Sequence, residues 1–242
     1  MRELLTRFGR HNIGFLWMAG EPMLFTLGVS LIWTLTRGFH NASPITGASF
    51  ALTGYTSIQL WRNPVGRTAK AIEVNLALMY HRNVKMLDIV VARIVIEVAG
   101  ILLSFFSLLF IFAGFDLCPL PVDWLLLISG LILHSTFGAG LALAISALSE
   151  TTELVERLWH AVAYFLVPLS GALYMVDWLP AQVQSAAVLV PMISGTEMIR
   201  GGLFGAAVPT HYRVDVILGW SGCLIAYALF HIRRLSSRLE PE

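Results

Sequence analysis

Hydrophobic residues run along the chain in long blocks that contain few charges, and polar residues gather between the blocks. Blocks of about 20 apolar residues match a transmembrane helix, whereas β-barrel strands are shorter and alternate apolar with polar positions. The pattern predicts an all-α polytopic membrane protein, a single transmembrane domain over residues 1–242. Its six predicted spans lie at about 22–38, 45–62, 89–114, 122–148, 158–176 and 214–232.

Composition excludes several other classes of protein. Of the 242 residues, 57% are hydrophobic and 13% charged, whereas soluble domains have about 25% charged residues. This balance excludes a soluble enzyme, a coiled coil and a disordered chain. A net charge of +1 argues against nucleic-acid binding, and two cysteines form neither a disulfide framework nor a zinc site. We therefore expect no metal and no nucleic acid.

The basic residues predict how the bundle is oriented. Of the 16 Lys and Arg residues, only Arg37, Arg200 and Arg213 fall on one side of the predicted spans, and the other 13 fall on the opposite side. Loops rich in Lys and Arg stay in the cytoplasm. Both termini are therefore predicted to be cytoplasmic.

Two segments predict helices that do not span the membrane. Residues 2–17 place apolar side chains on one face and Arg7 and Arg10 on another, as in an amphipathic helix at the lipid headgroups that ends at Glu21-Pro22. Residues 67–85 also repeat apolar residues at helical spacing. Two interpretations of 67–85 stay open, a helix resting on lipid and a coupling helix that docks on a cytoplasmic partner.

The predicted external segment 177–213 is too long for a hairpin loop and too apolar for a solvated one. Its prolines divide it into pieces too short to cross a core of about 30 Å, which predicts a pair of short re-entrant helices. Glu197 and Arg200 lie three residues apart, so they can pair on one helix face. Pro168 with Ser170-Gly171 predicts a kink in the fifth span.

The chain carries no motif for energy conversion or catalysis. There is no phosphate-binding loop, and His134 is the only titratable residue near the middle of a predicted span. Gly219-Trp220-Ser221-Gly222 matches the serine motif of rhomboid proteases, but His231 lies about 13 Å further along the same predicted helix. We therefore expect no enzyme, no cofactor in this chain, and energy supplied by another chain.

Polar and aromatic residues suggest a path for a sugar. Hydroxyl residues form a stripe on the second predicted span, with Tyr55, Gln59 and Arg62 on its other side. The hydroxyls fit either close helix packing or a hydrated path, and the aromatics fit either interfacial belts or stacking faces for sugar rings. The small residues Gly138, Ala142 and Ser146 permit close helix contact. The candidate entrance or path residues are Arg7, Arg10, Trp17, Tyr55, Trp61, Arg62 and Trp159.

Three stretches together resemble capsular-polysaccharide export permeases of the KpsM, BexB and CtrC type, within the type-2 ABC exporters. The first is Arg2-Glu3, Thr6-Arg7-Phe8-Gly9, Gly14, Leu16-Trp17 and Glu21-Pro22. The second is Ala71-Ile72-Glu73, Asn75, Tyr80, Arg82, Val84-Lys85, Asp88, Ala92-Arg93 and Glu97. The third is Ser170-Gly171, Tyr174, Leu179-Pro180, Pro191, Glu197 and Arg200. Val84-Lys85-Met86 and Val190-Pro191-Met192 depart from the Val-Lys-Pro and Asn-Pro-Leu of the family.

The resemblance implies a bacterial inner-membrane permease that forms a homodimer with two copies of a separate ABC ATPase, which binds ATP and Mg. It also implies a periplasmic co-polymerase adaptor, an outer-membrane polysaccharide exporter and a lipid-anchored acidic glycan as cargo. The alternatives are a permease for O-antigen, teichoic acid or a small hydrophobic compound, and a non-transporting scaffold. Contact with the ATPase is expected at the loop 149–157 and at Ile72, Glu73, Leu76, Met79 and Arg82.

Overall fold

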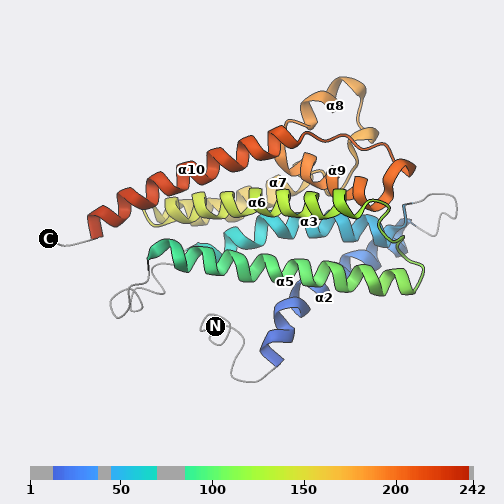
Figure 1. The fold of residues 1–242 in the computed structure, drawn as a ribbon, viewed down its shortest axis with the longest axis horizontal. Coiled ribbons are helices and arrows are strands. Elements are labelled where there is room, and N and C mark those ends of the chain that lie inside the picture. The colour runs from blue at the N-terminus through green and yellow to red at the C-terminus, as the bar shows by residue number, and fades with distance from the viewer. Residues whose placement is uncertain (1–12, 38–44, 70–84, 240–242) are drawn as a thin grey trace.

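The computed structural model describes residues 13–37, 45–69 and 85–239, and within these ranges the chain is helical and contains no strand. Most of the long helices run along one axis, whereas the N-terminal part of the first described helix points away from the bundle (Figure 1). The long helices are α2 (Ile13–Arg37), α3 (Gly47–Thr68), α5 (Met86–Gly114), α6 (Trp124–Ser149), α7 (Glu153–Leu169) and α10 (Val214–Leu239). The shorter elements are η1 (Val176–Trp178), α8 (Ala181–Ala187), α9 (Pro191–Phe204) and η2 (Gly205–Ala207).

Three of the described helices are long and apolar enough to cross a membrane, at Leu87–Gly114, Trp124–Ser149 and Val214–Arg234. The apolar part of α2, Ala19–Leu35, is shorter. At 17 residues, α7 rises only about 26 Å, while the 22-residue α3 is long enough but carries many polar residues. The all-helical class is confirmed for the described residues, and six spans stay a prediction.

α2 continues through Pro22, so the predicted helix end at Glu21-Pro22 is wrong. Proline has no N–H, so the carbonyl four residues before it loses its helical donor, a loss that membrane helices tolerate. Here the Pro22 carbonyl accepts hydrogen bonds from Thr26 Oγ1 at 2.8 Å and from Gln59 Nε2 at 3.2 Å. The second contact comes from α3, which sequence periodicity does not reveal.

α3 continues to Thr68 although it contains Pro64, so Arg67 and Thr68 belong to this helix and not to a separate helix over 67–85. The Thr68 hydroxyl lies 2.9 Å from the Pro64 carbonyl, and the Ala69 N–H donates to Val65 O. Residues 70–84 lie outside the described residues, so the rest of the coupling helix stays a prediction.

The fifth predicted span, 158–176, is corrected to α7, which begins at Glu153 and ends at Leu169. Pro168 and Gly171 therefore end this helix where a kink was expected. Gly171 has a φ of +74°, a backbone conformation that only glycine adopts readily, and it turns the chain toward η1. The early start of α7 also reduces the predicted loop 149–157 to residues 150–152.

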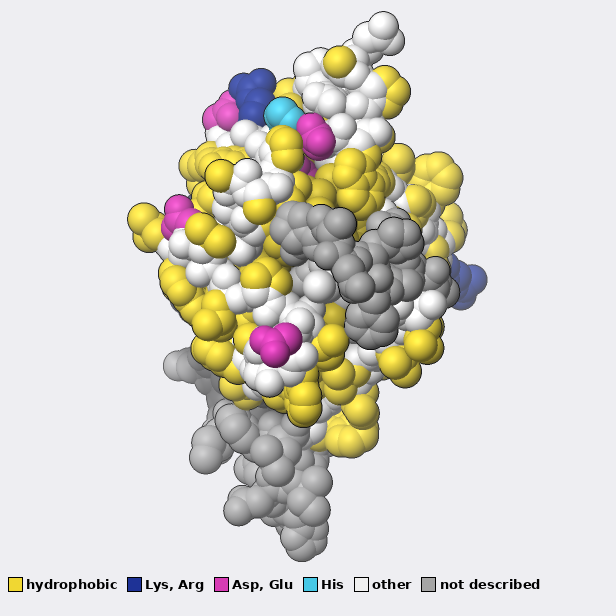
Figure 2. Space-filling model, turned by 90° about the vertical axis from the view of Figure 1, so that its right-hand side faces the viewer, with side chains coloured by type: hydrophobic (Ala, Val, Ile, Leu, Met, Phe, Trp, Pro, Cys, Tyr) yellow, Lys and Arg dark blue, Asp and Glu magenta, His cyan; other side chains and the backbone are white. Residues whose placement is uncertain are grey.

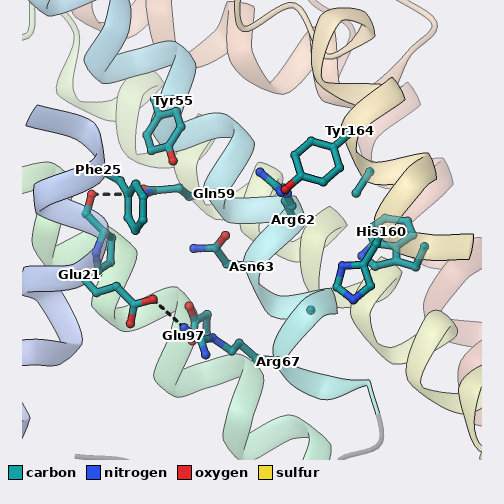
Figure 3. Close-up of a pocket in the computed structure, with 14 residues that line it drawn as sticks. Glu21, Phe25, Tyr55, Gln59, Arg62, Asn63, Arg67, Glu97, His160 and Tyr164 are labelled. Carbon is teal, nitrogen blue, oxygen red and sulfur yellow. Dashed lines mark hydrogen bonds and ion pairs between the residues drawn. The ribbon is translucent and has the colours of Figure 1, made fainter. Parts of the chain in front are cut away.

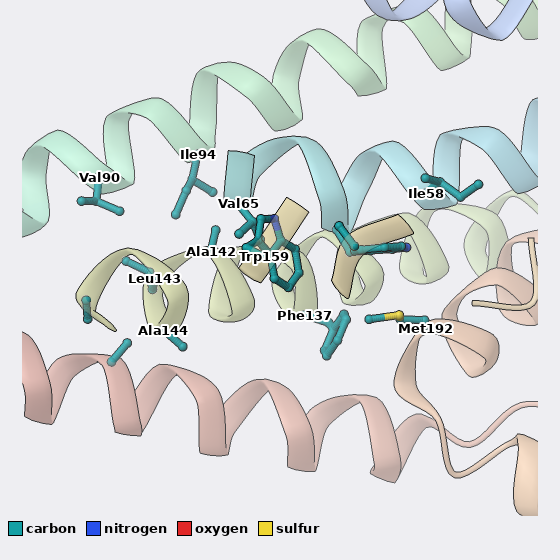
Figure 4. Packing of buried hydrophobic residues seen from close by; sticks show 14 of the residues in the cluster. Ile58, Val65, Val90, Ile94, Phe137, Ala142, Leu143, Ala144, Trp159 and Met192 are labelled. Atoms are coloured by element: carbon teal, nitrogen blue, oxygen red, sulfur yellow. The ribbon is translucent and has the colours of Figure 1, made fainter. Parts of the chain in front are cut away.

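α6 lies in the middle of the bundle, where it packs against α3, α9 and α10. Its small residues permit a close contact with α3. A Cβ atom on Gly138 would stand 2.1 Å from the Leu60 carbonyl oxygen, and Ser146 Oγ lies 3.1 Å from the Thr68 carbonyl oxygen. The contact buries an apolar cluster among α3, α5, α6 and α10 (Figure 4), which Trp159 of α7 joins.

The segment 177–213 contains two short helices, of very different exposure. All 14 residues of α9 are buried, while α8 projects from the bundle (Figure 1). Re-entry of the segment 177–213 into the outer leaflet of the membrane stays a prediction. Figure 2 views this end of the molecule, where hydrophobic side chains cover much of the surface and charged side chains form small groups. Arg213 pairs with Asp215 there, and His211 Nε2 lies 3.9 Å from Asp177 Oδ1.

Candidate functional site

A cavity of about 440 Å³ lies among α2, α3, α5 and α7, at the end of the bundle where α3 ends and α5 begins (Figure 3). Ligand pockets of proteins have volumes of about 300–1,000 Å³. Tyr55, Gln59, Arg62 and Gly66 recur every three or four residues, so one face of α3 forms a wall of the cavity. The cavity therefore has the size and the organised lining of a binding site.

Three charged residues from three helices form a chain along the cavity. Arg67 Nη2 of α3 lies 2.7 Å from Glu21 Oε1 of α2, and Arg67 Nε lies 3.8 Å from Glu97 Oε2 of α5. The Glu97 side chain is nearly buried, with only 7% of it exposed, whereas that of Arg67 is 43% exposed. Arg93 Nη1 also donates to the Arg67 carbonyl at 3.1 Å. These ion pairs connect α2, α3 and α5.

Arg62 lies in the same cavity with a different environment. Its guanidinium carbon stands 4.4 Å from the ring centroid of Tyr164 on α7, a cation–π distance. Among the described residues, no carboxylate forms an ion pair with Arg62. Within the described ranges, Arg62 is therefore the arginine of the cavity lining that has no carboxylate partner.

Amide and aromatic side chains complete the lining. Gln59 donates to the Pro22 carbonyl, but its buried Oε1 accepts no hydrogen bond from any described residue. Trp159 and Tyr164 of α7 also line the cavity, and Figure 3 shows Tyr164 close to Arg62 of α3. Such a lining offers stacking faces and polar groups to one ligand.

The structure divides the predicted path residues into three groups. Tyr55, Arg62 and Trp159 line the cavity. Trp61 is fully buried behind it, in edge-to-face contact with Trp159 at a centroid distance of 6.3 Å, and Trp17 is 52% exposed and does not line it. The predicted residues that lie outside the described ranges are Arg7, Arg10, Ile72, Glu73, Leu76, Met79 and Arg82.

Sequence reasoning missed Glu21, Arg67 and Glu97 as a group. All three lie near ends of predicted spans on the side rich in Lys and Arg, and opposite charges at adjacent helix ends are a signal for pairing. The assignment of Arg67 to a separate helix concealed that signal. His160 and Tyr164 also line the cavity and were not predicted.

A second polar cluster lies on α9, remote from the cavity lining. Arg200 Nη1 is 3.7 Å from Glu197 Oε1, and both side chains are almost completely buried. The Arg200 guanidinium donates to the carbonyls of Gly171, Tyr174 and Ala172 at 2.8, 2.6 and 2.7 Å. Burial lowers the pKa of Arg200 to about 10, so the side chain remains charged at neutral pH. One guanidinium thus fixes the turn that follows α7.

Glu197 holds two further segments against α9. Its Oε1 accepts a hydrogen bond from the Val176 N–H at 3.3 Å, and its Oε2 accepts one from the His211 N–H at 3.2 Å. Arg200 also stacks on Phe50 of α3 at 4.2 Å. The pair connects α3, η1 and the segment before α10, so it is a structural centre. Within the described ranges, no three His, Cys, Asp or Glu side chains are placed to hold a metal ion.

The described residues form a helical bundle with apolar helices of membrane length, which defines a polytopic helical membrane protein, and a cavity with charged residues in its lining lies between its helices. The sequence profile of the ABC-2 type transporter family matches residues 1–204, and the chain belongs to this family.

Several relatives match along nearly their whole length. The chain is 36% identical to the capsule polysaccharide export inner-membrane protein CtrC of Neisseria meningitidis serogroup A. It is also 36% identical to the capsule polysaccharide export inner-membrane protein BexB of Haemophilus influenzae. Each match covers 100% of this chain and 91% of the relative. The polysialic acid transport protein KpsM of Escherichia coli is 24% identical, over 95% of this chain and 87% of that protein.

Proposed function

We propose that the chain is the permease subunit of an ATP-driven exporter that moves a lipid-anchored acidic polysaccharide of the capsular type across the bacterial inner membrane. The observation that carries this proposal is the similarity over the full chain to CtrC and BexB, whose names state capsule polysaccharide export. Fold alone does not define cargo. The cavity adds cationic, amide and aromatic groups suited to an acidic sugar.

The distribution of basic residues supports an inward-facing cavity. Arg62, Arg67 and Arg93 lie at the cavity end of the bundle, which receives most Lys and Arg residues of the chain. By the positive-inside rule this end faces the cytoplasm, as do both termini. The cavity then lies where a glycan made in the cytoplasm reaches the permease. Arg7 and Arg10, on the predicted interfacial helix, would attract its acidic groups, each cation contributing about 1 kcal/mol near a membrane surface.

The energy source and the assembly complete the proposal. A second copy of this chain forms the permease dimer, and two ABC ATPase subunits bind ATP and Mg. The ATPase docks on the predicted coupling helix, through Leu76, Met79 and their neighbours, and on residues 150–152 between α6 and α7. A periplasmic co-polymerase adaptor and an outer-membrane polysaccharide exporter then receive the glycan. The family membership of the chain supports the ATPase as the motor.

Deletion of the gene for this chain in its own organism tests the cargo. We expect the polysaccharide to disappear from the cell surface and accumulate inside the cell. A plasmid copy of the gene should restore surface polysaccharide, and the protein purified from that strain should bring the ATPase with it. Immunoblots of surface extracts and cytoplasmic fractions measure both pools. Unchanged surface polysaccharide, combined with new sensitivity to hydrophobic drugs, would instead assign a small-molecule cargo. Unchanged surface polysaccharide without any sensitivity would contradict export altogether.

A further inference from the structure

We propose that Arg62 is the residue that recognises one oxyanion of the cargo, a carboxylate or a phosphodiester. This inference rests on the proposed function, because it names the chemical group that the cavity binds. It depends on the different environments of Arg62 and Arg67, two arginines of the same helix.

Both carboxylates that line the cavity contact Arg67. Glu21 and Glu97 lie 2.7 and 3.8 Å from Arg67 atoms, so that guanidinium is already compensated. Among the described residues, Arg62 has no such partner. A cation without a counter-ion in a confined cavity binds an anion more strongly than a paired one, because no existing ion pair has to be broken.

Contact with Tyr164 prepares Arg62 for this role. The guanidinium carbon lies 4.4 Å from the centroid of the Tyr164 ring, so the ring holds the side chain at this wall of the cavity. A guanidinium is a planar fork of N–H donors that matches the two oxygens of a carboxylate or a phosphate. The contact is made to a ring face and not to an acceptor atom.

The remaining lining fits a sugar beside that oxyanion. Gln59 Oε1 is buried without a donor from the described residues, and a ligand hydroxyl supplies one. Trp159 and Tyr164 provide aromatic faces for an apolar sugar face. A glycan unit with a carboxylate and the glycerol phosphodiester of an anionic lipid both present an oxyanion next to hydroxyls, so the test separates the two.

The test measures binding to the full-length protein in phosphatidylcholine nanodiscs, whose lipid carries no net charge. The first probe is tetragalacturonate, compared with its methyl ester, which has the same sugars without charge. The second is dihexanoyl-phosphatidylglycerol, compared with dihexanoylglycerol. We expect at least one acidic probe to bind about tenfold more tightly than its neutral partner, and less tightly as salt rises. The arm that shows this difference identifies a carboxylated sugar or a lipid phosphodiester as the ligand.

The variants distinguish recognition from a structural role by the sign of their effects. Arg62→Gln should weaken the acidic probe about tenfold and leave its neutral partner unchanged, and Arg62→Lys should give a smaller loss. Glu21→Gln should strengthen the acidic probe about threefold, because it removes a negative charge and frees Arg67. Arg213→Gln, at the opposite end of the bundle, is the matched control and should change neither affinity.

Equal affinity for both acidic probes and their neutral partners in the wild-type protein would overturn the proposal. So would weaker acidic-probe binding in Glu21→Gln, or an Arg62→Gln loss that affects the neutral probes equally. If Arg62→Gln does not yield folded protein, Arg62→Lys and Glu21→Gln still decide the outcome. A negative binding result with normal polysaccharide export rejects Arg62 and leaves the proposed function intact. Charge-selective binding without any export defect in the deletion strain rejects the proposed function instead.

Discussion

Arg200→Met gives the sharpest test of how the fold is held together. The substitution keeps an unbranched apolar stem and removes the guanidinium. Three carbonyls, of Gly171, Ala172 and Tyr174, then lose their donors at 2.6–2.8 Å, and Glu197 remains buried without its cation. The turn after α7 and the ends of η1 and α9 should loosen together.

The magnitude follows from burial. Removing one partner of a buried ion pair costs about 3–5 kcal/mol, because the other charge stays uncompensated. Each kcal/mol lowers the melting temperature of a chain of this size by about 2–4 °C. A loss of about 4 kcal/mol therefore predicts a melting temperature that is lower by about 8–16 °C.

A double-mutant cycle separates the pair from the surrounding hydrogen bonds. Glu197→Gln should cost less than Arg200→Met, since the amide oxygen still accepts from a neighbouring N–H. In the double variant the cost should fall below the sum of the single costs, because no unpaired charge remains. Fluorescence-detected gel filtration after heating measures the melting temperatures in detergent. Arg213→Met, at an exposed pair, is the control and should leave the melting temperature unchanged. Additive costs, or an Arg200→Met melting temperature within 2 °C of wild type, would refute the buried-pair argument.

Two further predictions concern tight packing and a buried thiol. Gly195→Ala should destabilise the protein by about 1–3 kcal/mol, because the new Cβ would stand 1.9 Å from Nδ1 of His134. Adding His134→Ala to this variant removes the clashing ring and should recover much of the lost stability. Gly219→Ala, with no atom within 4 Å of its Cβ, should show no such loss in the same melting assay, and equal losses at both glycines would contradict the packing argument. Burial raises the pKa of the Cys118 thiol to about 12, so few thiolates are present at pH 8 to react with maleimide. In a Cys223→Ser background, where Cys118 is the remaining cysteine, maleimide should therefore label the protein only after unfolding. Rapid labelling of the folded protein would show that the thiol is accessible.

Sequence periodicity predicted the long helices because each is marked by its own apolar residues. It located α5, α6 and α10 closely, since uninterrupted apolar blocks coincide with those helices. It misplaced ends that depend on contacts between helices. The continuation of α2 through Pro22 accompanies a contact with Gln59 of α3, and the turn that follows α7 is fixed by Arg200. Local pattern contains neither contact.

The candidate site shows the same division. Tyr55, Arg62 and Trp159 were predicted as path residues from their polar or aromatic character and their positions near span ends, and all three line the cavity. The roles of Arg62 and Arg67 could not be distinguished from sequence, because two arginines five residues apart on one helix have similar local surroundings. Their difference arises from where α2 and α5 place Glu21 and Glu97.

The sequence by itself determined the class of this protein: an apolar, charge-poor helical chain whose motifs identify its family. The hydrophobicity and charge of each residue are properties of that residue alone, so their distribution along the chain follows from the sequence without a structure. The tertiary structure alone decided which charges are compensated and which remain available. Ion pairing depends on distances of a few ångströms between helices remote in sequence, and only packing sets those distances.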